Sequence, residues 1–294
     1  MSSQRRIPID ERIKCVVQKY LAPKIQTKPI ADPIDGCVQL KEIVLSNKRI
    51  IVAPDLSALV EEAVERIAAR IGQSGARAAI CLTGGSTPKP VYERLATEPY
   101  RSTIPWNRTH WFWGDDRFVP LENGHSNAGM ALRAFLECVS VPSGNIHPMP
   151  TGAASPEDAA RLYQAELERF YGRDQLDPGV PLFDLVLMGL GSDGHTASLF
   201  PGAPALTEND RWAVGVAQAG IEPFVPRVTL TIPAMASTRE MLFLVCGPDK
   251  REVLGRVLSG EDLPAASAQA VGELIWLADR DAAPAVYPAG TTTI

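Results

Sequence analysis

The sequence predicts an α/β fold, in which a mostly parallel sheet is covered by helices on both faces of a single main domain. Three observations lead to this prediction. Strand and helix patterns alternate from about residue 42 onward. Several strand patterns are continuous apolar runs, as expected where both faces of a strand are buried. The chain has 294 residues, 45% of them hydrophobic, which is enough for one large core.

Residues 1–40 are predicted to form an N-terminal arm, and residues 41–294 the α/β domain. The arm is basic and rich in proline, and within it Ile9–Leu21 has the spacing of one amphipathic helix. Chain ends of this kind usually pack on the surface or stay mobile. We therefore expect the arm to be dispensable for the chemistry of the protein.

The first elements of the domain follow the spacing rules for buried strands and amphipathic helices. Arg49–Ala53 predicts a strand. Asp55 is placed to cap a helix that runs to Ile71, because apolar residues recur along it every three or four positions. Ala78–Leu82 predicts a buried strand, and Pro88–Ala96 a helix with proline in its first turn.

The middle of the chain continues the alternation. His110–Trp113 predicts a strand, Asn127–Cys138 a helix capped by Ser126, and Pro156–Tyr171 a helix that Ser155 caps with proline at its first position. The apolar run Phe183–Met188 predicts a buried parallel strand. Two other histidines are expected in loops, His125 and His147.

The last part of the chain supplies the remaining strands. Trp212–Val216 is an apolar run, and Pro226–Pro233 alternates as a strand does. Met241–Cys246 predicts a strand, Asp249–Leu258 a helix, and Glu273–Leu277 a final strand. The alternation implies right-handed strand–helix–strand units.

Composition and charge exclude several classes of protein. A formal net charge of −5 argues against general nucleic-acid binding. No apolar run reaches the length of a membrane span, and the first residues lack the apolar stretch of a signal peptide. The five cysteines are scattered and show no metal-binding spacing. We expect a cytoplasmic monomer or small homo-oligomer that binds neither nucleic acid nor membrane and holds no structural metal.

The segment Gly189–Gly202 carries the strongest indication of chemistry. Its glycines allow a sharp turn after the strand Phe183–Met188, and His195 directly after them can carry a proton near neutral pH. Active sites of α/β proteins lie at this carboxyl edge of the sheet. A tight turn with a solvent-facing histidine is the simpler alternative.

The same segment matches the G-x-G-x-x-G pattern of dinucleotide-binding folds, at Gly189, Gly191 and Gly194. That pattern needs a long helix after its third glycine and an acidic residue at the end of the next strand. Pro201 would end such a helix after about two turns. Glu208 and Asp210 precede the next apolar run instead of ending it. The dinucleotide interpretation is therefore disfavoured.

The loop Gly84–Thr87 has the composition of an anion site. It follows a predicted buried strand, and Pro88 opens the next helix. Its two glycines expose backbone N–H groups, Ser86 and Thr87 add hydroxyls, and the helix adds the positive end of its dipole. The P-loop pattern is absent. An ordinary strand-to-helix turn with a Ser/Thr cap fits these residues equally well.

Two arginines stand in segments that end or form strands. Arg117 can bind a phosphate as a planar fork, and Asp115 and Asp116 can orient it or accept hydrogen bonds from sugar hydroxyls. A solvated salt-bridge cluster is the alternative. Arg227 lies beside apolar residues of an alternating run, so it needs either a carboxylate or a ligand anion as its partner.

Four motifs together resemble the 6-phosphogluconolactonase family, within the larger glucosamine-6-phosphate isomerase/lactonase superfamily: Leu82–Pro88, Asp115–Pro120 with Ser126-Asn127, Gly189–Gly202 and Arg227–Leu230. The motifs occur in the same order as in the family, within residues from about 45 to 280, and Gly189–Gly202 is the most specific of them. The family usually has Asp-Glu-Arg where this chain has Asp115-Asp116-Arg117, which puts a role of Asp116 in doubt.

The resemblance implies a Rossmann-like fold without a nucleotide and the hydrolysis of 6-phospho-D-glucono-1,5-lactone to 6-phosphogluconate, in the oxidative pentose phosphate pathway. No metal or other cofactor is implied, and the ligand is a small phosphorylated sugar lactone. His195 would be the general base, Asp193 would orient His195 or the water, and backbone N–H groups of the glycine turn would stabilise the oxyanion. The implied substrate-binding residues are Gly84, Gly85, Ser86, Thr87, Asp115, Arg117, Gly191, Gly194 and Arg227, with the phosphate on the loop and the two arginines.

Two other functions stay open. A sugar-phosphate isomerase or deaminase on the same fold needs a carboxylate that moves a proton between C1 and C2. Related deaminases carry Asn-Gly-His where this chain has Asp193-Gly194-His195, and they lack its Ala-Ser-Leu-Phe-Pro sequence. A non-catalytic sugar-phosphate-binding protein would have no use for His195.

Overall fold

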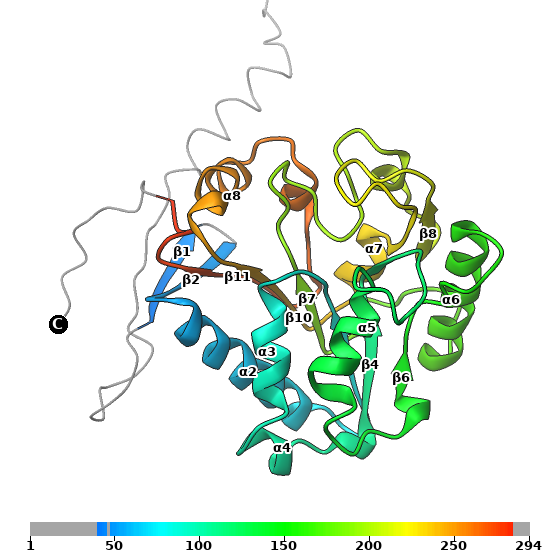
Figure 1. The fold of residues 1–294 in the computed structure, drawn as a ribbon. Helices are drawn as coiled ribbons and strands as arrows, with labels where there is room; N and C mark the ends of the chain where they lie inside the picture. Colours follow the sequence, from blue (N-terminus) through cyan, green and yellow to red (C-terminus); the bar gives the residue numbers. More distant parts are fainter. Residues whose placement is uncertain (1–39, 46–47, 285–294) are drawn as a thin grey trace, which may run out of the picture.

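The structure is a computed structural model that describes residues 40–45 and 48–284. An eight-stranded sheet forms the centre of the molecule (Figure 1). The strand order is β1-β2-β11-β10-β7-β3-β4-β6, and all neighbours are parallel except β1 and β2. The strands are β1 Lys41–Leu45, β2 Lys48–Ala53, β3 Ala78–Leu82, β4 Thr109–Trp113, β6 Ile146–His147, β7 Leu185–Met188, β10 Glu240–Val245 and β11 Glu273–Asp279.

The predicted mostly parallel sheet is therefore confirmed, with differences at its margins. β1 and β6 were not expected from the sequence. β7 begins at Leu185, and Phe183 makes only an isolated bridge to Thr238. The predicted arm and its helix Ile9–Leu21 lie outside the described residues, so the division at residue 40 stays a prediction.

A second, three-stranded antiparallel sheet lies apart from the first, in the order β5-β9-β8, with β5 Asp115–Arg117, β8 Ala213–Val216 and β9 Arg227–Leu230. The expectation of one sheet missed it. Gly114 connects the two sheets, because its N–H donates to Leu82 O of β3 and its carbonyl accepts from Leu230 N of β9. The charged residues after β4 thus form a strand of their own and are not the end of β4.

The helices predicted from the sequence lie close to their expected bounds, as α2 Leu56–Gln73, α3 Pro88–Leu95, α6 Pro156–Tyr171 and α8 Arg251–Leu258, and the helix expected over residues 127–138 begins as α5 Asn127–Ala131. Two short helices were not predicted: α4 Tyr100–Thr103, and α7 Ile232–Ala236, which begins inside the run Pro226–Pro233 expected as a strand. Short 3₁₀ turns lie at Trp106–Arg108, Ser143–Asn145, Pro204–Thr207, Pro248–Lys250 and Pro264–Ser267. The side chains of Asp55 and Ser155 cap α2 and α6 by accepting from Ala58 N and Asp158 N. The helix expected over residues 127–138 changes to a π-helical turn at Leu132.

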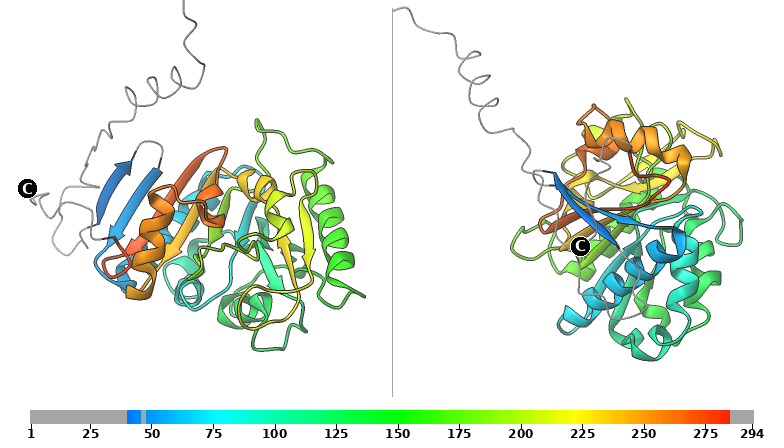
Figure 2. Two further views of the ribbon diagram at one scale, coloured as in Figure 1. Left: turned by 90° about the horizontal axis from the view of Figure 1, so that it is seen from above. Right: turned by 90° about the vertical axis from the view of Figure 1, so that its left-hand side faces the viewer.

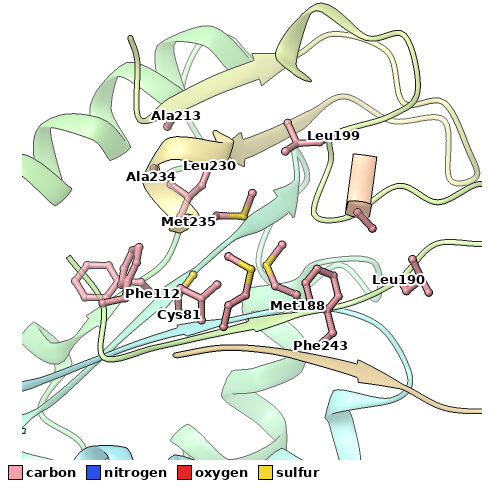
Figure 3. Packing of buried hydrophobic residues seen from close by; sticks show 14 of the residues in the cluster. Cys81, Phe112, Met188, Leu190, Leu199, Ala213, Leu230, Ala234, Met235 and Phe243 are labelled. Atoms are coloured by element: carbon pink, nitrogen blue, oxygen red, sulfur yellow. The ribbon is translucent and has the colours of Figure 1, made fainter. Parts of the chain in front are cut away.

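Two hydrophobic cores cover the two faces of the main sheet. One contains α2, α3 and α5, with residues such as Leu59 and Tyr92 against Ile80. The other contains α6, α7, α8 and the second sheet. Figure 2 shows the blue and cyan helices on one side of the sheet and the orange α8 on the other. In Figure 3, Met188 and Phe243 of the main sheet face Leu230 of the second sheet.

His147 corrects one expectation from the sequence, because it belongs to the strand β6 and not to a loop. Its Nε2 lies 3.0 Å from His110 Nδ1, and its Nδ1 lies 2.8 Å from Glu166 Oε1 of α6. Its ring stacks on Phe112 with the centroids 4.3 Å apart. His125, by contrast, does lie in a loop.

Because β10, β7, β3 and β4 are neighbours and parallel, the loops after them meet at one edge of the sheet. The described helices include none that is long and apolar enough to cross a membrane.

Candidate active site

The predicted catalytic residues lie in the turn after β7. Asp193 Oδ1 accepts a hydrogen bond from the backbone N–H of His195 at 3.0 Å and lies 2.5 Å from His195 Nδ1. Burial raises the pKa of Asp193, but these hydrogen bonds from His195 outweigh it and hold that pKa below its usual value. An ionised carboxylate only accepts hydrogen bonds, so the proton of a neutral His195 sits on Nδ1. Nε2 then carries the lone pair and acts as the basic nitrogen.

The glycines of this turn have a conformational role. A Cβ at Gly191 would lie 2.0 Å from His195 Nδ1, so only glycine leaves room for the imidazole. Gly194 has φ +84°, a conformation that favours glycine. Gly191 N donates to His195 O, and Gly194 N donates to Gly191 O. Substrate binding by these two N–H groups, expected from the sequence, is therefore not supported, because both already have acceptors.

The segment after His195 also argues against the dinucleotide-binding interpretation. Residues 195–203 contain no helix, and the next helical turn is Pro204–Thr207. The long helix that the G-x-G-x-x-G pattern requires is thus absent from this described segment.

The loop Gly84–Thr87 has free backbone donors in the structure. In the described part of the chain no acceptor takes the N–H groups of Gly84, Gly85 or Ser86, and Gly85 has φ +104°. Thr87 makes no side-chain cap on α3. A cavity of about 130 Å³ opens beside the loop and is also lined by Leu190, Cys246 and Lys250.

Lys250 is a candidate residue that the sequence analysis missed. It stands in the 3₁₀ turn after β10 and supplies a cation to the wall of this cavity. Its position soon after the end of a predicted strand was the available signal. Cys246, on the same wall, is held as a thiol because burial and a hydrogen bond to Asp279 raise its pKa to about 12.

Arg117 and Arg227 lie directly opposite each other in the antiparallel pair β5–β9. Arg227 is 3% exposed, and its guanidinium donates to the carbonyls of Val225 and Pro223. Arg117 donates to His125 O and to Asn127 Oδ1, and its buried Nε has no partner in the part of the chain that the structure describes. Neither guanidinium forms an ion pair within the described residues.

This arrangement leaves two neighbouring positive charges without a carboxylate in contact. Burial first, and then Arg117, lowers the pKa of Arg227, while the carboxylates of Asp115 and Asp116 nearby oppose the shift. Like charges directly opposite each other in a sheet are destabilising. The salt-bridge alternative for Arg117 finds no support within the described residues, and a bound anion is a partner that would offset the repulsion.

Asp116 has a structural role. It is fully buried, and its carboxylate accepts from the N–H groups of Arg117, Asn127 and Ala128 and from the Ser126 hydroxyl. It therefore fixes the start of α5. Burial raises its pKa to about 6 against these hydrogen bonds, and Asp115 adds to the rise.

Asn127 connects the loop Gly84–Thr87 to the arginines, although the sequence analysis gave it only a capping role. Its Nδ2 donates to Asp115 O at 3.0 Å, and its Oδ1 accepts from Arg117 Nη1 at 2.9 Å. A Cβ at Gly84 would lie 1.9 Å from that same Oδ1. The two predicted anion-binding segments are thus in direct contact through one side chain. The motif Ser126-Asn127 was the sequence signal that could have identified this role of Asn127.

The described residues contain no group of three or more His, Cys, Asp or Glu side chains arranged to hold a metal ion.

Comparisons with known proteins agree with the four motifs. A family model described as glucosamine-6-phosphate isomerases/6-phosphogluconolactonase matches residues 54–276. The 6-phosphogluconolactonase of Synechocystis sp. is 44% identical over 250 residues, 83% of this chain and 98% of the relative. That of Mycobacterium tuberculosis is 38% identical over 245 residues, 79% and 96%. The solved 6-phosphogluconolactonase from Trypanosoma cruzi superposes with a TM-score of 0.71 at 29% identity, over 81% of this chain and 97% of that one.

Proposed function

Because the chain belongs to the glucosamine-6-phosphate isomerase/6-phosphogluconolactonase family, we propose that it hydrolyses 6-phospho-D-glucono-1,5-lactone with His195 as the general base. The activity is the one named for relatives at 38–44% identity that match nearly their whole length. The product is 6-phosphogluconate, an intermediate of the pentose phosphate pathway. A deaminase also shares the fold, but at 18% identity that likeness concerns the fold alone.

The observation that supports the mechanism best is the Asp193–His195 pair, in which Asp193 holds Nδ1–H and leaves Nε2 as the basic nitrogen. Nε2 takes a proton from a water molecule as the water oxygen attacks the lactone carbonyl carbon. The resulting tetrahedral intermediate opens by breaking the bond to the ring oxygen. That oxygen receives the proton from the imidazolium, and His195 returns to its neutral form. Asp193 stabilises the imidazolium throughout, because its carboxylate already holds Nδ1–H.

The phosphate has a matching site at the same edge of the sheet. The loop Gly84–Thr87 offers free N–H groups, Arg117 and Arg227 offer unpaired cations, and Lys250 lines the adjoining cavity. Guanidinium groups suit a phosphate because they donate in a planar fork. The substrate would thus be held by its phosphate while its lactone carbon meets the water on His195.

We expect the protein to work in the cytoplasm on a small soluble metabolite. We also expect it to act as a monomer or a small homo-oligomer, which analytical ultracentrifugation of the full chain would decide.

The test is a lactone-hydrolysis assay that follows acid release and subtracts spontaneous hydrolysis. Wild type should accelerate the reaction, and His195→Ala should lower kcat by about 10²-fold or more, because a general base typically contributes that much. The thermal unfolding temperature should change little, since His195 is partly exposed. A folded His195→Ala protein with near-normal kcat would remove the proposed base. Ammonia release from glucosamine 6-phosphate, with no lactone hydrolysis, would favour the deaminase instead.

A further inference from the structure

Ser198 joins the turn that carries His195 to the second sheet. It lies three residues after the histidine and is fully buried. Its hydroxyl donates to Asp115 Oδ2 at 2.6 Å, and its backbone N–H donates to Thr229 Oγ1 at 3.3 Å. Asp115 and Thr229 face each other in the β5–β9 pair. One serine therefore contacts both strands on which the two arginines stand.

The backbone between His195 and Ser198 is strained. Ala197 has φ +49°, the one positive φ found at a non-glycine residue in the described part of the chain. Such a conformation persists only where the surroundings enforce it, and it is concentrated at functional sites. Thr196 supports this turn on the side of β7 by donating its hydroxyl to Gly189 O at 2.8 Å. Ser198 supports it on the side of the second sheet.

The partner of Ser198 is a carboxylate of the site itself. Asp115 is 5% exposed, and its other oxygen accepts from Asn127 Nδ2 at the longer distance of 3.3 Å. A hydroxyl donating to an ionised carboxylate makes a strong, short hydrogen bond. The contact spans 83 residues of sequence and is the direct side-chain bond between the His195 turn and β5.

We propose that Ser198 is a positioning residue for lactone hydrolysis: its bond to Asp115 fixes the distance between His195 and the anion-binding arginines. The inference rests on the proposed function. The base must reach a water near the lactone carbon while the phosphate is held on β5 and β9, so a displacement of about 1 Å between these parts costs catalysis. The β5–β9 ladder aligns Arg117 with Arg227, so their phosphate contacts should survive the loss of the Ser198 hydroxyl. Its loss therefore affects kcat and not KM.

The experiment compares Ser198→Ala with Ser237→Ala. Ser237 is also buried and also makes one buried hydrogen bond, accepting from Leu182 N at 2.9 Å, but it precedes β10 at the opposite edge of the sheet. Both variants should lower the unfolding temperature by similar amounts. Only Ser198→Ala should lower kcat, by about tenfold or more with KM within about twofold of wild type. An unchanged kcat, or a loss that appears chiefly in KM, overturns the inference.

A second measurement distinguishes a positioning role of Ser198 from a general disturbance of the structure. Asp115→Ala and the double variant Ser198→Ala/Asp115→Ala are assayed beside the single one. Because alanine at position 115 leaves the Ser198 hydroxyl without this acceptor, both changes remove the same hydrogen bond. The double variant should therefore be no slower than the slower single variant, whereas multiplied losses would contradict the proposal. If Ser198→Ala does not fold, Ser198→Cys, with a weaker donor of similar size, takes its place with the same expected and contrary outcomes. A wild-type chain without lactonase activity would defeat the proposed function as well; an active wild type with an equally active Ser198→Ala defeats this inference alone.

Discussion

At the scale of single residues, the site depends on where a side chain is missing as much as on where one is present. His195 owes its orientation to Asp193 and its space to Gly191, since any Cβ there would lie 2.0 Å from the ring. The sequence predicted His195 and Asp193 from the glycine turn and the motif. It did not predict the purpose of Gly191, because whether the side chain four positions later comes close depends on the path of the turn.

Gly191→Ala should therefore mimic the loss of the base. The added methyl group must displace the imidazole, so we expect kcat to fall by about 10²-fold while the affinity for 6-phosphogluconate stays within a few-fold of wild type. Steady-state kinetics with product inhibition measures both quantities. Gly189→Ala is the matched control, because the nearest atom to its Cβ would be Thr83 Oγ1 at an ordinary 3.8 Å. Equal kcat values in the two variants would contradict this account of Gly191.

At the scale of elements, the β5–β9 pair explains why two arginines far apart in sequence act together. Arg117 and Arg227 are 110 positions apart, yet they are register partners. The sequence predicted each as a phosphate ligand from its motif. It did not predict their pairing, because a three-residue strand such as Asp115–Arg117 gives no periodic signal and was interpreted as the end of β4.

Arg227→Ala should chiefly weaken substrate binding. Loss of one charge-assisted contact costs about 1.5–3 kcal/mol, so we expect KM for the lactone and Kd for 6-phosphogluconate to rise by roughly 10–100-fold. Kinetics and isothermal titration calorimetry measure the two. Arg239→Ala, which removes an arginine paired with Asp184 before β10, should change neither. Wild-type affinity in Arg227→Ala would take this residue out of the phosphate site.

The contact among β4, β6 and α6 makes stability depend on pH. Burial, and then His147 and Arg77, lower the pKa of His110 to about 4, and burial also lowers the pKa of His147 although Glu166 opposes it. A histidine in the unfolded chain titrates near 6.5. Between pH of about 6.5 and 4 the unfolded chain thus holds more protons, and the free energy of unfolding falls as the pH falls.

His110→Phe should flatten this dependence. After allowance for partial solvent exposure we expect wild type to lose about 1–2 kcal/mol more than the variant between pH 6.5 and 4. Denaturant unfolding at several pH values measures it. The raised pKa of Asp116 contributes in the opposite direction over part of this range, but equally in both proteins, so the difference isolates the histidine. His125→Phe, in an exposed loop, is the control and should follow wild type. Parallel curves for wild type and His110→Phe would show that the contact does not titrate.

At the scale of the whole molecule, the sequence predicted the layers of the fold better than their margins. Continuous apolar runs such as Ala78–Leu82 identified the central strands, because both of their faces are buried. β6 was missed because it has two residues and is held by side-chain contacts of His147. The second sheet was missed because its strands pair across long stretches of chain, which local patterns do not encode.

A chain that begins at Val38 should fold and hydrolyse the lactone at close to the full rate. The family match begins at residue 54 and β1 begins at Lys41, so both lie within the shortened chain. Thermal unfolding and the lactone assay on the shortened and full chains provide the comparison. Aggregation or lost activity of the shortened chain would place the arm within the domain or its assembly.

Dialysis against a strong chelator should leave the activity intact. The proposed steps use only protein side chains and water, and the phosphate is held by cations of the chain itself. The assay is run before dialysis, after it, and after return of divalent ions. Activity that disappears and returns with an ion would require a metal in the mechanism.

The connection through Gly114 constrains how chains of this fold can diverge. Trp113 ends β4 and Asp115 begins β5, so a single residue separates the two sheets. Adding or deleting one position there would turn Asp115 and Arg117 to the wrong faces of β5. A few residues later the exposed loop around Gly124 has open space on its surface. Among distant relatives, insertions should therefore occur in that loop and be absent between Trp113 and Arg117. The fixed spacing between these two residues would then help to recognise chains that retain the site.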